Sequence, residues 1–298
     1  MLDIVGKRFW FFLIAGVVIL ICIISLATFG LKAGIEFSSG SLMTVRFEQE
    51  VGQGELESEL ASLGYTNAIV QHSGEGDFLI RLPELSSQAK TALEAGLANR
   101  FGTLNVGEFD AVSPIIAAET TRNAGIAVAV AAIGILLYIT WAFHRMPNPL
   151  RYGTCAIVAL VHDALVAVGV FSIIGGILGW EINLMFVTGI LAVIGYSVNN
   201  TVVVFDRIRE NLMRDAKAGF EMVVNNSLVE TLSRSLNTAL TTLFVSVALL
   251  LFVGATIQNF AVVLVVGIVA GTYSSLFISP PLLVVWRKGE WGRFILRS

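Results

Sequence analysis

Long apolar stretches separated by short polar connections make up most of this chain. A helix that crosses a hydrocarbon core of about 30 Å needs about 20 mainly apolar residues. Six stretches meet this requirement: Phe9 to Leu31, Ala124 to Phe143, Tyr152 to Ile174, Leu184 to Phe205, Leu236 to Val253, and Phe260 to Trp286. The first stretch is longer than the apolar region of about 7 to 15 residues in a signal peptide, so we expect it to remain in the mature protein as a helix. The pattern predicts an α-helical membrane protein with six transmembrane helices.

The hydrophobic period changes in the polar insertion between the first two stretches, about Gly40 to Ala111. Apolar residues alternate with polar ones where strands are expected and recur every three or four positions where helices are expected. The predicted order is a strand through Met43, Val45 and Phe47, a helix through Leu56, Leu60 and Leu63, strands at Asn67 to His72 and Phe78 to Leu82, a helix from Ala89 to Phe101, and a strand from Leu104 to Ala111. The residues Ser73, Gly74, Glu75 and Gly76 predict the turn between the middle strands. This βαββαβ order predicts an inserted α+β domain with a ferredoxin-like fold.

We therefore divide the chain into four parts. Residues 1–33 form the N-terminus and the first helix, 34–119 the inserted domain, 120–286 the bundle of the second to sixth helices, and 287–298 a tail. Within the bundle, the segment 206–233 mixes charged residues with apolar ones such as Met222, Val223 and Leu228. This mixture predicts helical turns lying against the membrane surface, either as a connector or as a contact for a partner.

The distribution of basic residues predicts the orientation. With a cytoplasmic N-terminus, the loops at 179–183 and 254–259 lie outside, and they contain no Lys or Arg. All of the following residues then lie on the cytoplasmic side: Lys7, Arg8, Arg145, Arg151, Arg207, Arg209, Arg214, Lys217, Arg234, Arg287, Lys288, Arg293 and Arg297. By the positive-inside rule, both termini are cytoplasmic and the inserted domain is outside.

Composition agrees with a membrane protein and excludes several other classes. Hydrophobic residues make up 55% of the chain and charged residues 14%, against about 25% charged residues in soluble domains. The net charge of −3 gives no electrostatic support for nucleic-acid binding. Cys22 and Cys155 lie in apolar stretches and form no disulfide framework or metal motif. Hydrolase, zinc-protease and nucleotide-binding motifs are absent from the sequence, so we expect no catalytic site, cofactor or metal.

Ionisable residues inside membrane spans are costly and are functional candidates for that reason. Asp163 lies about eleven residues into the third span, or roughly 16 Å at about 1.5 Å per residue. Asp163 either exchanges a proton or pairs with another helix. Its neighbour His162 is expected on a different face of the helix and is a secondary candidate.

The fourth and fifth spans carry further polar candidates. Ser197, Asn199 and Asn200 lie in the fourth span. One face of the fifth span carries polar residues at helical spacing, namely Arg234, Asn237, Thr238 and Thr241. We expect this face to turn toward protein. Asn200 and Arg234 both lie nearer the cytoplasmic end and could meet. The alternative for the Asn, Ser and Thr residues is ordinary hydrogen bonding between helices, worth about 0.6 kcal/mol per pair.

Six strings spread along nearly the whole chain point to one known family. They are Gly34 to Gly40, Val112 to Pro114, Leu160 to Asp163, Ile194 to Asn211, Ser233 to Thr238 and Gly271 to Ser275. Together they resemble the SecF family of the bacterial Sec protein-export machinery. The fourth string is the longest match, and the family has GIDFTGG, VGP, LLHD, SRTINT and GTYSS at the others. Ser39 and Ser113 stand where the family usually has Gly.

The resemblance implies a half-transporter of the resistance-nodulation-division superfamily in the bacterial inner membrane. Such a subunit pairs with the six-helix subunit SecD and acts with the SecYEG channel on exported preproteins, using the proton or sodium gradient; its surroundings are membrane lipid. In the family, an Asp and an Arg belong to the ion pathway. Arg234 matches that Arg, whereas Asn200 stands at the Asp position and cannot carry a proton. We therefore expect SecD to supply the carboxylate, with Asp163, Asn199, Asn200, Arg234 and Asn237 along the pathway and His162, Ser197 and Thr241 as secondary candidates.

Two other functions remain open from the sequence. One is a half-transporter for small molecules or lipids, although an outer domain of about 70 residues is small for a drug-binding region. The other is a structural subunit that conducts no ions, which Asn200 favours.

Overall fold

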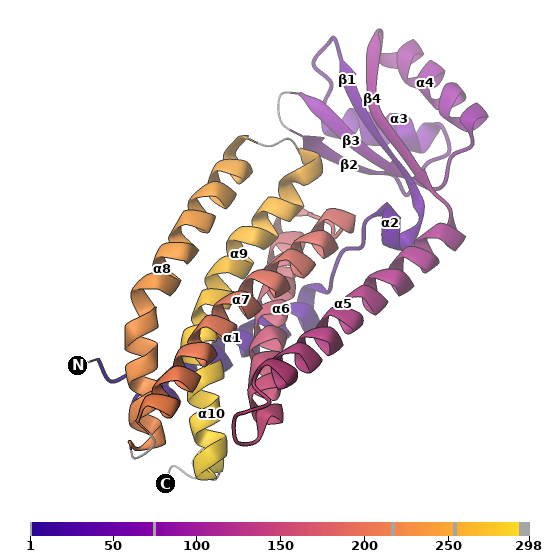
Figure 1. Cartoon of the computed structure of the whole chain (residues 1–298). Coiled ribbons are helices and arrows are strands. Elements are labelled where there is room, and N and C mark those ends of the chain that lie inside the picture. Colours follow the sequence, from indigo (N-terminus) through magenta and orange to yellow (C-terminus); the bar gives the residue numbers. More distant parts are fainter. Residues whose placement is uncertain (1, 74–75, 216–217, 253–254, 292–298) are drawn as a thin grey trace. The chain divides into compact units, whose positions relative to one another are not determined.

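The apolar stretches form long helices in the computed structural model of the chain (Figure 1). The structure describes residues 2–73, 76–215, 218–252 and 255–291. Several predicted features lie outside the described residues. They are Gly74 and Glu75 of the expected turn, the predicted end of the fifth span at Val253, Lys217, Arg293, Arg297, and most of the expected tail. Two units are distinguished: a helical unit of Met1–Lys32 and Ile126–Ser298, and an α+β unit of Ala33–Gly125.

Among the described residues, six helical segments are long and apolar enough to cross a membrane, in agreement with the expected six spans. Their helices are α1 (Arg8–Phe29), α5 (Pro114–Ala142), α6 (Pro149–Leu178), α7 (Leu184–Arg214), α8 (Phe220–Phe252), and α9 (Ala255–Phe277) followed by α10 (Ser279–Lys288). The helix break at Ile278 precedes Pro280 and Pro281. Proline lacks the N–H group that a continuous helix needs, so the chain restarts there as α10.

The segment 206–233, predicted to form helical turns against the membrane surface, is continuous with two long helices. Its first part is the end of α7 and its last part is the beginning of α8. Ile208, Val224 and Leu228 are completely buried in the core of the helical unit. Burial against neighbouring helices therefore stabilises these helix ends. For this reason α7 and α8 extend beyond the apolar stretches predicted as their membrane spans.

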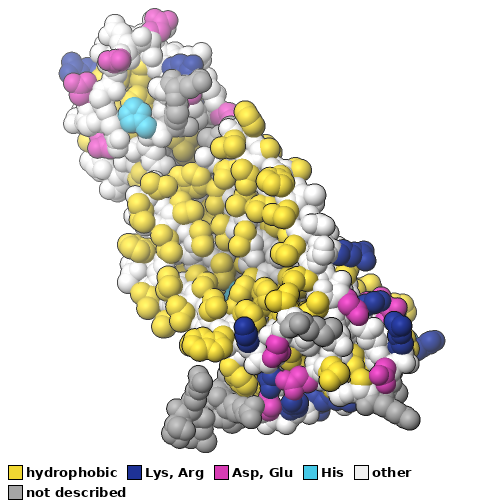
Figure 2. Space-filling view, turned by 90° about the vertical axis from the view of Figure 1, so that its left-hand side faces the viewer, with side chains coloured by type: hydrophobic (Ala, Val, Ile, Leu, Met, Phe, Trp, Pro, Cys, Tyr) yellow, Lys and Arg dark blue, Asp and Glu magenta, His cyan; other side chains and the backbone are white. Residues whose placement is uncertain are grey.

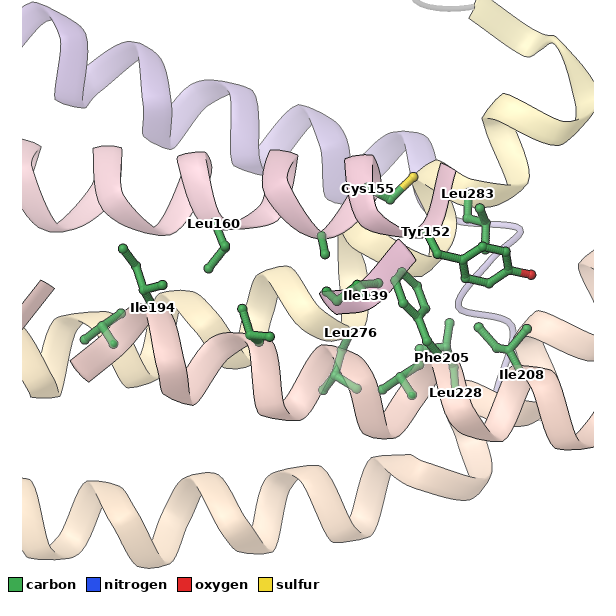
Figure 3. Close-up of a cluster of buried hydrophobic side chains, with 14 of the residues drawn as sticks. Ile139, Tyr152, Cys155, Leu160, Ile194, Phe205, Ile208, Leu228, Leu276 and Leu283 are labelled. Atoms are coloured by element: carbon green, nitrogen blue, oxygen red, sulfur yellow. The ribbon is translucent and has the colours of Figure 1, made fainter. Parts of the chain in front are cut away.

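The core of the helical unit lies between α6, α7 and α9 and extends to α8 and α10. Ile139, Phe205, Leu228 and Leu276 point into this core from different helices (Figure 3). The rings of Phe143 and Tyr152 stack with centroids 5.4 Å apart. Both rings also meet the Phe205 ring edge-on, with centroids 5.9 Å and 5.3 Å away, so these contacts join the end of α5 and the beginning of α6 to α7.

Glycines allow α9 to approach α7 closely. A Cβ atom on Gly267 would lie 2.1 Å from Val193 Cγ2, and one on Gly271 would lie 2.9 Å from Ser197 Cβ. The two glycines are four residues apart and form a small-xxx-small motif, which is common at helix contacts in membranes. This motif brings polar residues of the two helices within hydrogen-bonding distance.

The outer surface of the helical unit is largely apolar. Trp141 is 71% exposed, and Val130, Phe244 and Leu251 are also well exposed. Figure 2 shows hydrophobic side chains across the middle of this unit and most of its charged side chains at one end. Such a surface is stable against lipid or against another membrane subunit.

The α+β unit contains a four-stranded antiparallel sheet in the order β2-β3-β1-β4. Its elements are α2 (Ile35–Ser38), β1 (Gly40–Phe47), α3 (Gln53–Ser62), β2 (Ile69–Ser73), β3 (Asp77–Leu82), α4 (Ser87–Phe101) and β4 (Leu104–Val112). Met43 and Ile80 from the sheet and Leu60 and Leu97 from the helices are completely buried together. The short helix α2 was not expected from the sequence.

The connection from α2 to β1 contains an uncommon backbone conformation. Ser39 has φ 62° and ψ 167°, a region that is essentially restricted to glycine. Gly40 follows with φ 126°, and a Cβ atom there would lie 2.7 Å from the carbonyl oxygen of Leu82. The serine at position 39 therefore has backbone strain that a glycine would avoid.

Candidate functional site

Asp163 is the centre of a buried polar cluster in the helical unit. Its side chain is on α6 and only 1% of the residue is exposed. Ser197 Oγ of α7 and Ser274 Oγ of α9 both donate hydrogen bonds to Asp163 Oδ2, at 2.6 Å and 2.8 Å. The cluster therefore joins three helices through one carboxylate.

Local sequence explains why the three helices meet at this point. Ser197 and Ser274 have small side chains, and Gly271 lies one helical turn before Ser274, directly against Ser197. Asn183 caps the beginning of α7, where its Oδ1 accepts a hydrogen bond from the backbone N–H of Phe186 at 3.0 Å. The cap fixes the start of α7, and the glycine contact brings its middle close to α9.

His162 contacts Asp163 directly, contrary to the expectation that it points to a different face. His162 Nδ1 lies 3.0 Å from Asp163 Oδ1, and both residues are buried. Both functional groups are close to the backbone, so consecutive residues reach one another despite the turn of the helix between them. The His162 ring also stacks on Tyr273, whose hydroxyl donates to the carbonyl oxygen of Phe11 in α1 at 2.7 Å. The cluster thus extends toward α1.

Asn200 lies close to α9 but belongs to a separate hydrogen bond. Its Nδ2 donates to Ser275 Oγ at 2.5 Å, and both residues are buried. The preceding residue Asn199 is exposed. The fourth span therefore directs Ser197 and Asn200 into the protein and Asn199 away from it.

The polar face of α8, which we expect to turn toward protein, is not covered by the described part of this chain. Arg234, Asn237, Thr238 and Thr241 are all exposed. Thr238 and Thr241 each donate to backbone carbonyl oxygens of α8 itself. Arg234 has no hydrogen-bond or ion-pair partner among residues 2–73, 76–215, 218–252 and 255–291, and it does not bond to Asn200.

The structure thus separates the candidate residues into two groups. One is the buried cluster of Asp163, His162 and Ser197, with the Asn200 bond nearby, and the other is the exposed row on α8 together with Asn199. Ser274 and Ser275 also belong to the buried group, although they were not among the candidate residues. Ser274 and Ser275 lie three and four residues after Gly271, which itself follows Gly267 by four. This spacing of small residues on one helix face is the signal that could have placed them at the α7 contact.

The buried group can hold a proton or a negative charge. An ionised Asp163 accepts hydrogen bonds from two serine hydroxyls and from His162 in the tautomer that carries a proton on Nδ1. A protonated Asp163 carries no charge and donates one hydrogen bond itself, so fewer of these donors would bond to it. The amide of Asn200 neither gains nor loses a proton near neutral pH, so it cannot carry a proton.

These features define a multi-pass membrane protein with six apolar helices, a small α+β unit between the first two, and polar residues inside the helical unit. Two family patterns match the sequence. The pattern described as "Protein export membrane protein SecD/SecF, C-terminal" matches residues 92–289, and "SecD/SecF GG Motif" matches residues 24–51. The chain belongs to the SecF family of Sec translocase subunits.

Relatives and solved structures agree with this assignment. "Protein translocase subunit SecF" of Anaerolinea thermophila is 42% identical over 100% of this chain and 98% of its own length. "Protein translocase subunit SecDF" of Bacillus subtilis is 35% identical over 97% of this chain, which spans 38% of that longer protein. The crystal structure of SecDF from Thermus thermophilus has a TM-score of 0.85 and 31% identity, covering 96% of this chain and 39% of that one.

Proposed function

We propose that this chain pairs with SecD and uses an ion gradient, of protons or sodium, to drive late steps of protein export through the SecYEG channel. It lies in the bacterial inner membrane with both termini in the cytoplasm, and its α+β unit faces the exported preproteins on the outer side. The strand order β2-β3-β1-β4 with two helices supports a ferredoxin-like fold for that unit. Fused SecDF relatives, in which a chain like this one is part of a longer protein, support pairing with SecD.

The observation that carries this proposal is the uncovered polar face of α8. Arg234 lies near the cytoplasmic end of the span, two residues before the apolar stretch that begins at Leu236, and it is exposed with no partner in the described part of the chain. Charged side chains in membrane helices usually pair with other groups inside the protein. Lipid acyl chains would leave the charge of Arg234 and the nearby Asn237 side chain without hydrogen bonds. A carboxylate on SecD would pair with Arg234 and would supply the proton-carrying group that Asn200 does not.

Asp163 is the second group that we place on the ion pathway. It is buried at the contact of α6, α7 and α9, so a change in its charge alters hydrogen bonds between all three helices. One elementary charge that moves through 100 mV releases about 2.3 kcal/mol. This is comparable to the free energy of one hydrogen bond to a charged group, about 1.5–3 kcal/mol. A few protons per cycle would therefore supply enough free energy to rearrange the hydrogen bonds of Asp163 between these helices.

A structural subunit without ion conduction is the alternative, and Asn200 favours it. Export into inverted membrane vesicles that contain this chain and SecD distinguishes the two. If the chain conducts ions, Arg234→Ala and Asp163→Asn abolish the stimulation of export by the proton gradient, and Asn200→Asp preserves or increases it. Arg214→Ala, which removes an exposed arginine at the end of α7, is the control and leaves export unchanged.

The outcomes separate the models. Equal gradient-dependent export in all these variants would eliminate an ion role for this subunit while leaving its pairing with SecD intact. Loss of co-purification with SecD in Arg234→Ala alone would assign that residue to assembly.

A further inference from the structure

A basic pocket lies at the end of the helical unit where α6 and α8 begin and α10 ends. Its volume is about 240 Å³, and its lining includes Asn148, Arg151, Tyr152, Phe220 and Arg287. Drug-sized ligands occupy pockets of about 300–1,000 Å³, so this volume suits a smaller group. Neither the buried polar cluster nor the face of α8 includes any of these residues.

Aromatic rings hold both arginines of the pocket in place. The Arg287 guanidinium carbon lies 4.0 Å from the centroid of the Phe220 ring, and that of Arg151 lies 5.9 Å from the centroid of the Trp286 ring. These cation–π contacts orient the guanidinium groups without neutralising their charge. Preorganised guanidinium groups are well suited to bind the oxygens of a phosphate.

Neither arginine has an acidic partner in the part of the chain that the structure describes. Glu221 follows Phe220 directly, but it is already paired with Arg8 at 2.6 Å and with Lys288. Two positive charges therefore line one small pocket without a carboxylate to balance them. A negatively charged ligand would supply the missing charge.

The position of the pocket indicates a lipid as the source of that charge. Arg151 lies two residues after the start of α6, where a transmembrane span begins. Leu150 is 59% exposed beside it, and Trp141 and Trp286 lie near the same ends of α5 and α10. Tryptophans mark the depth of lipid headgroups in membrane proteins, and basic pockets between helices on the cytoplasmic side bind anionic headgroups. We propose that Arg151 and Arg287 bind the phosphate of an anionic phospholipid.

Native mass spectrometry of the purified full chain with added phosphatidylglycerol tests this site. Each basic residue contributes about fivefold to binding at a lipid surface, so Arg151→Gln and Arg287→Gln each weaken phosphatidylglycerol binding about fivefold and together about 25-fold. Arg145→Gln removes an equal charge from the loop between α5 and α6, outside the pocket, and should change binding by less than about twofold. Phosphatidylcholine should bind weakly to all variants.

Three results would overturn the proposal. They are an equal loss of binding in Arg145→Gln, equal binding of phosphatidylcholine, and displacement of phosphatidylglycerol by millimolar inorganic phosphate, which would indicate a site for free phosphate.

If Arg151→Gln does not fold, the single variant Arg287→Gln at the exposed end of α10 gives the same test. Arg287→Lys keeps the charge but lacks the planar fork, so it should bind with intermediate affinity.

Discussion

At Ser39 and Gly40, the free-energy cost of the backbone conformation depends on the side chain. Ser39 has a conformation that costs a residue other than glycine on the order of 1–3 kcal/mol. A glycine there loses more backbone entropy on folding, about 0.5–1 kcal/mol, so the two effects partly cancel. We expect Ser39→Gly to stabilise the α+β unit by about 1 kcal/mol. Hydrogen exchange of β1 in the purified chain measures this change.

Gly40→Ala is the opposite test at the neighbouring position. The added methyl group would meet the Leu82 carbonyl oxygen at 2.7 Å, and φ is 126°. This substitution should destabilise the same unit by about 2 kcal/mol or more. Slower exchange in Gly40→Ala, or faster exchange in Ser39→Gly, would contradict the assigned strain.

Arg46 and Asp77 give the α+β unit a weak dependence on pH. Hydrogen bonds from Arg46, at 2.5 Å and 3.0 Å, lower the pKa of the Asp77 carboxyl below its ordinary value, although burial opposes this effect in part. The pair's contribution is therefore complete above the unfolded pKa of about 3.9 and is lost as pH falls through the lower pKa of the folded state. The side chains are 52% and 27% exposed, so the contribution should stay below about 1 kcal/mol.

Hydrogen exchange of β1 and β3 at pH 5 and pH 3, corrected for intrinsic rates, tests this pair. Arg46→Gln should lower stability at pH 5 and reduce the difference between the two pH values. Arg100→Gln, which removes a mostly exposed arginine from α4, is the control and should keep the difference. The same pH dependence in Arg46→Gln and in the original chain would contradict the role of the pair.

At the scale of elements, the contact of α7 and α9 determines whether the buried polar cluster forms. Gly267→Ala places a methyl group 2.1 Å from Val193 Cγ2, where both helices are buried. We expect this overpacking to cost about 1–3 kcal/mol. Thermal unfolding of the chain in detergent measures the loss.

Gly195→Ala makes the same substitution in α7, where no atom other than its chain neighbours and the helix's own backbone lies within 4 Å of the added methyl group. Alanine favours helices by about 1 kcal/mol over glycine, so this control should be neutral or stabilising. Equal destabilisation by both substitutions would show that the α7 and α9 contact is not the cause.

The sequence predicted the number of spans well because apolar length must match the bilayer. It predicted the helix ends less well, since α7 and α8 continue beyond their apolar stretches and bury Ile208 and Leu228 against other helices. Among the site residues, Asp163 and Ser197 were identified because polar groups in a span are costly. The bond from Ser274 to Asp163 could not be predicted, because the small-residue pattern of α9 indicates a close helix contact but not which residue of α6 lies within reach of that contact.

For the whole molecule, the uncovered surfaces are as informative as the core. The row from Arg234 to Thr241 on α8 is polar and exposed, although it lies in a helix apolar enough to span a membrane. Thr238 and Thr241 bond to the backbone of α8, but lipid acyl chains cannot satisfy Arg234 and Asn237, and Arg234 has no partner in the described part of this chain. Our central claim is therefore that the helical unit is one half of a complex whose other half covers this face.

Photo-crosslinking from position 238 tests this claim most directly. A photoreactive amino acid replaces Thr238 on the exposed face, or Ser235 on the buried side of α8 as the control, in membranes with and without SecD. The account predicts an adduct with SecD from position 238 and none from position 235. The absence of a SecD adduct at position 238, in a chain that still co-purifies with SecD, would contradict it.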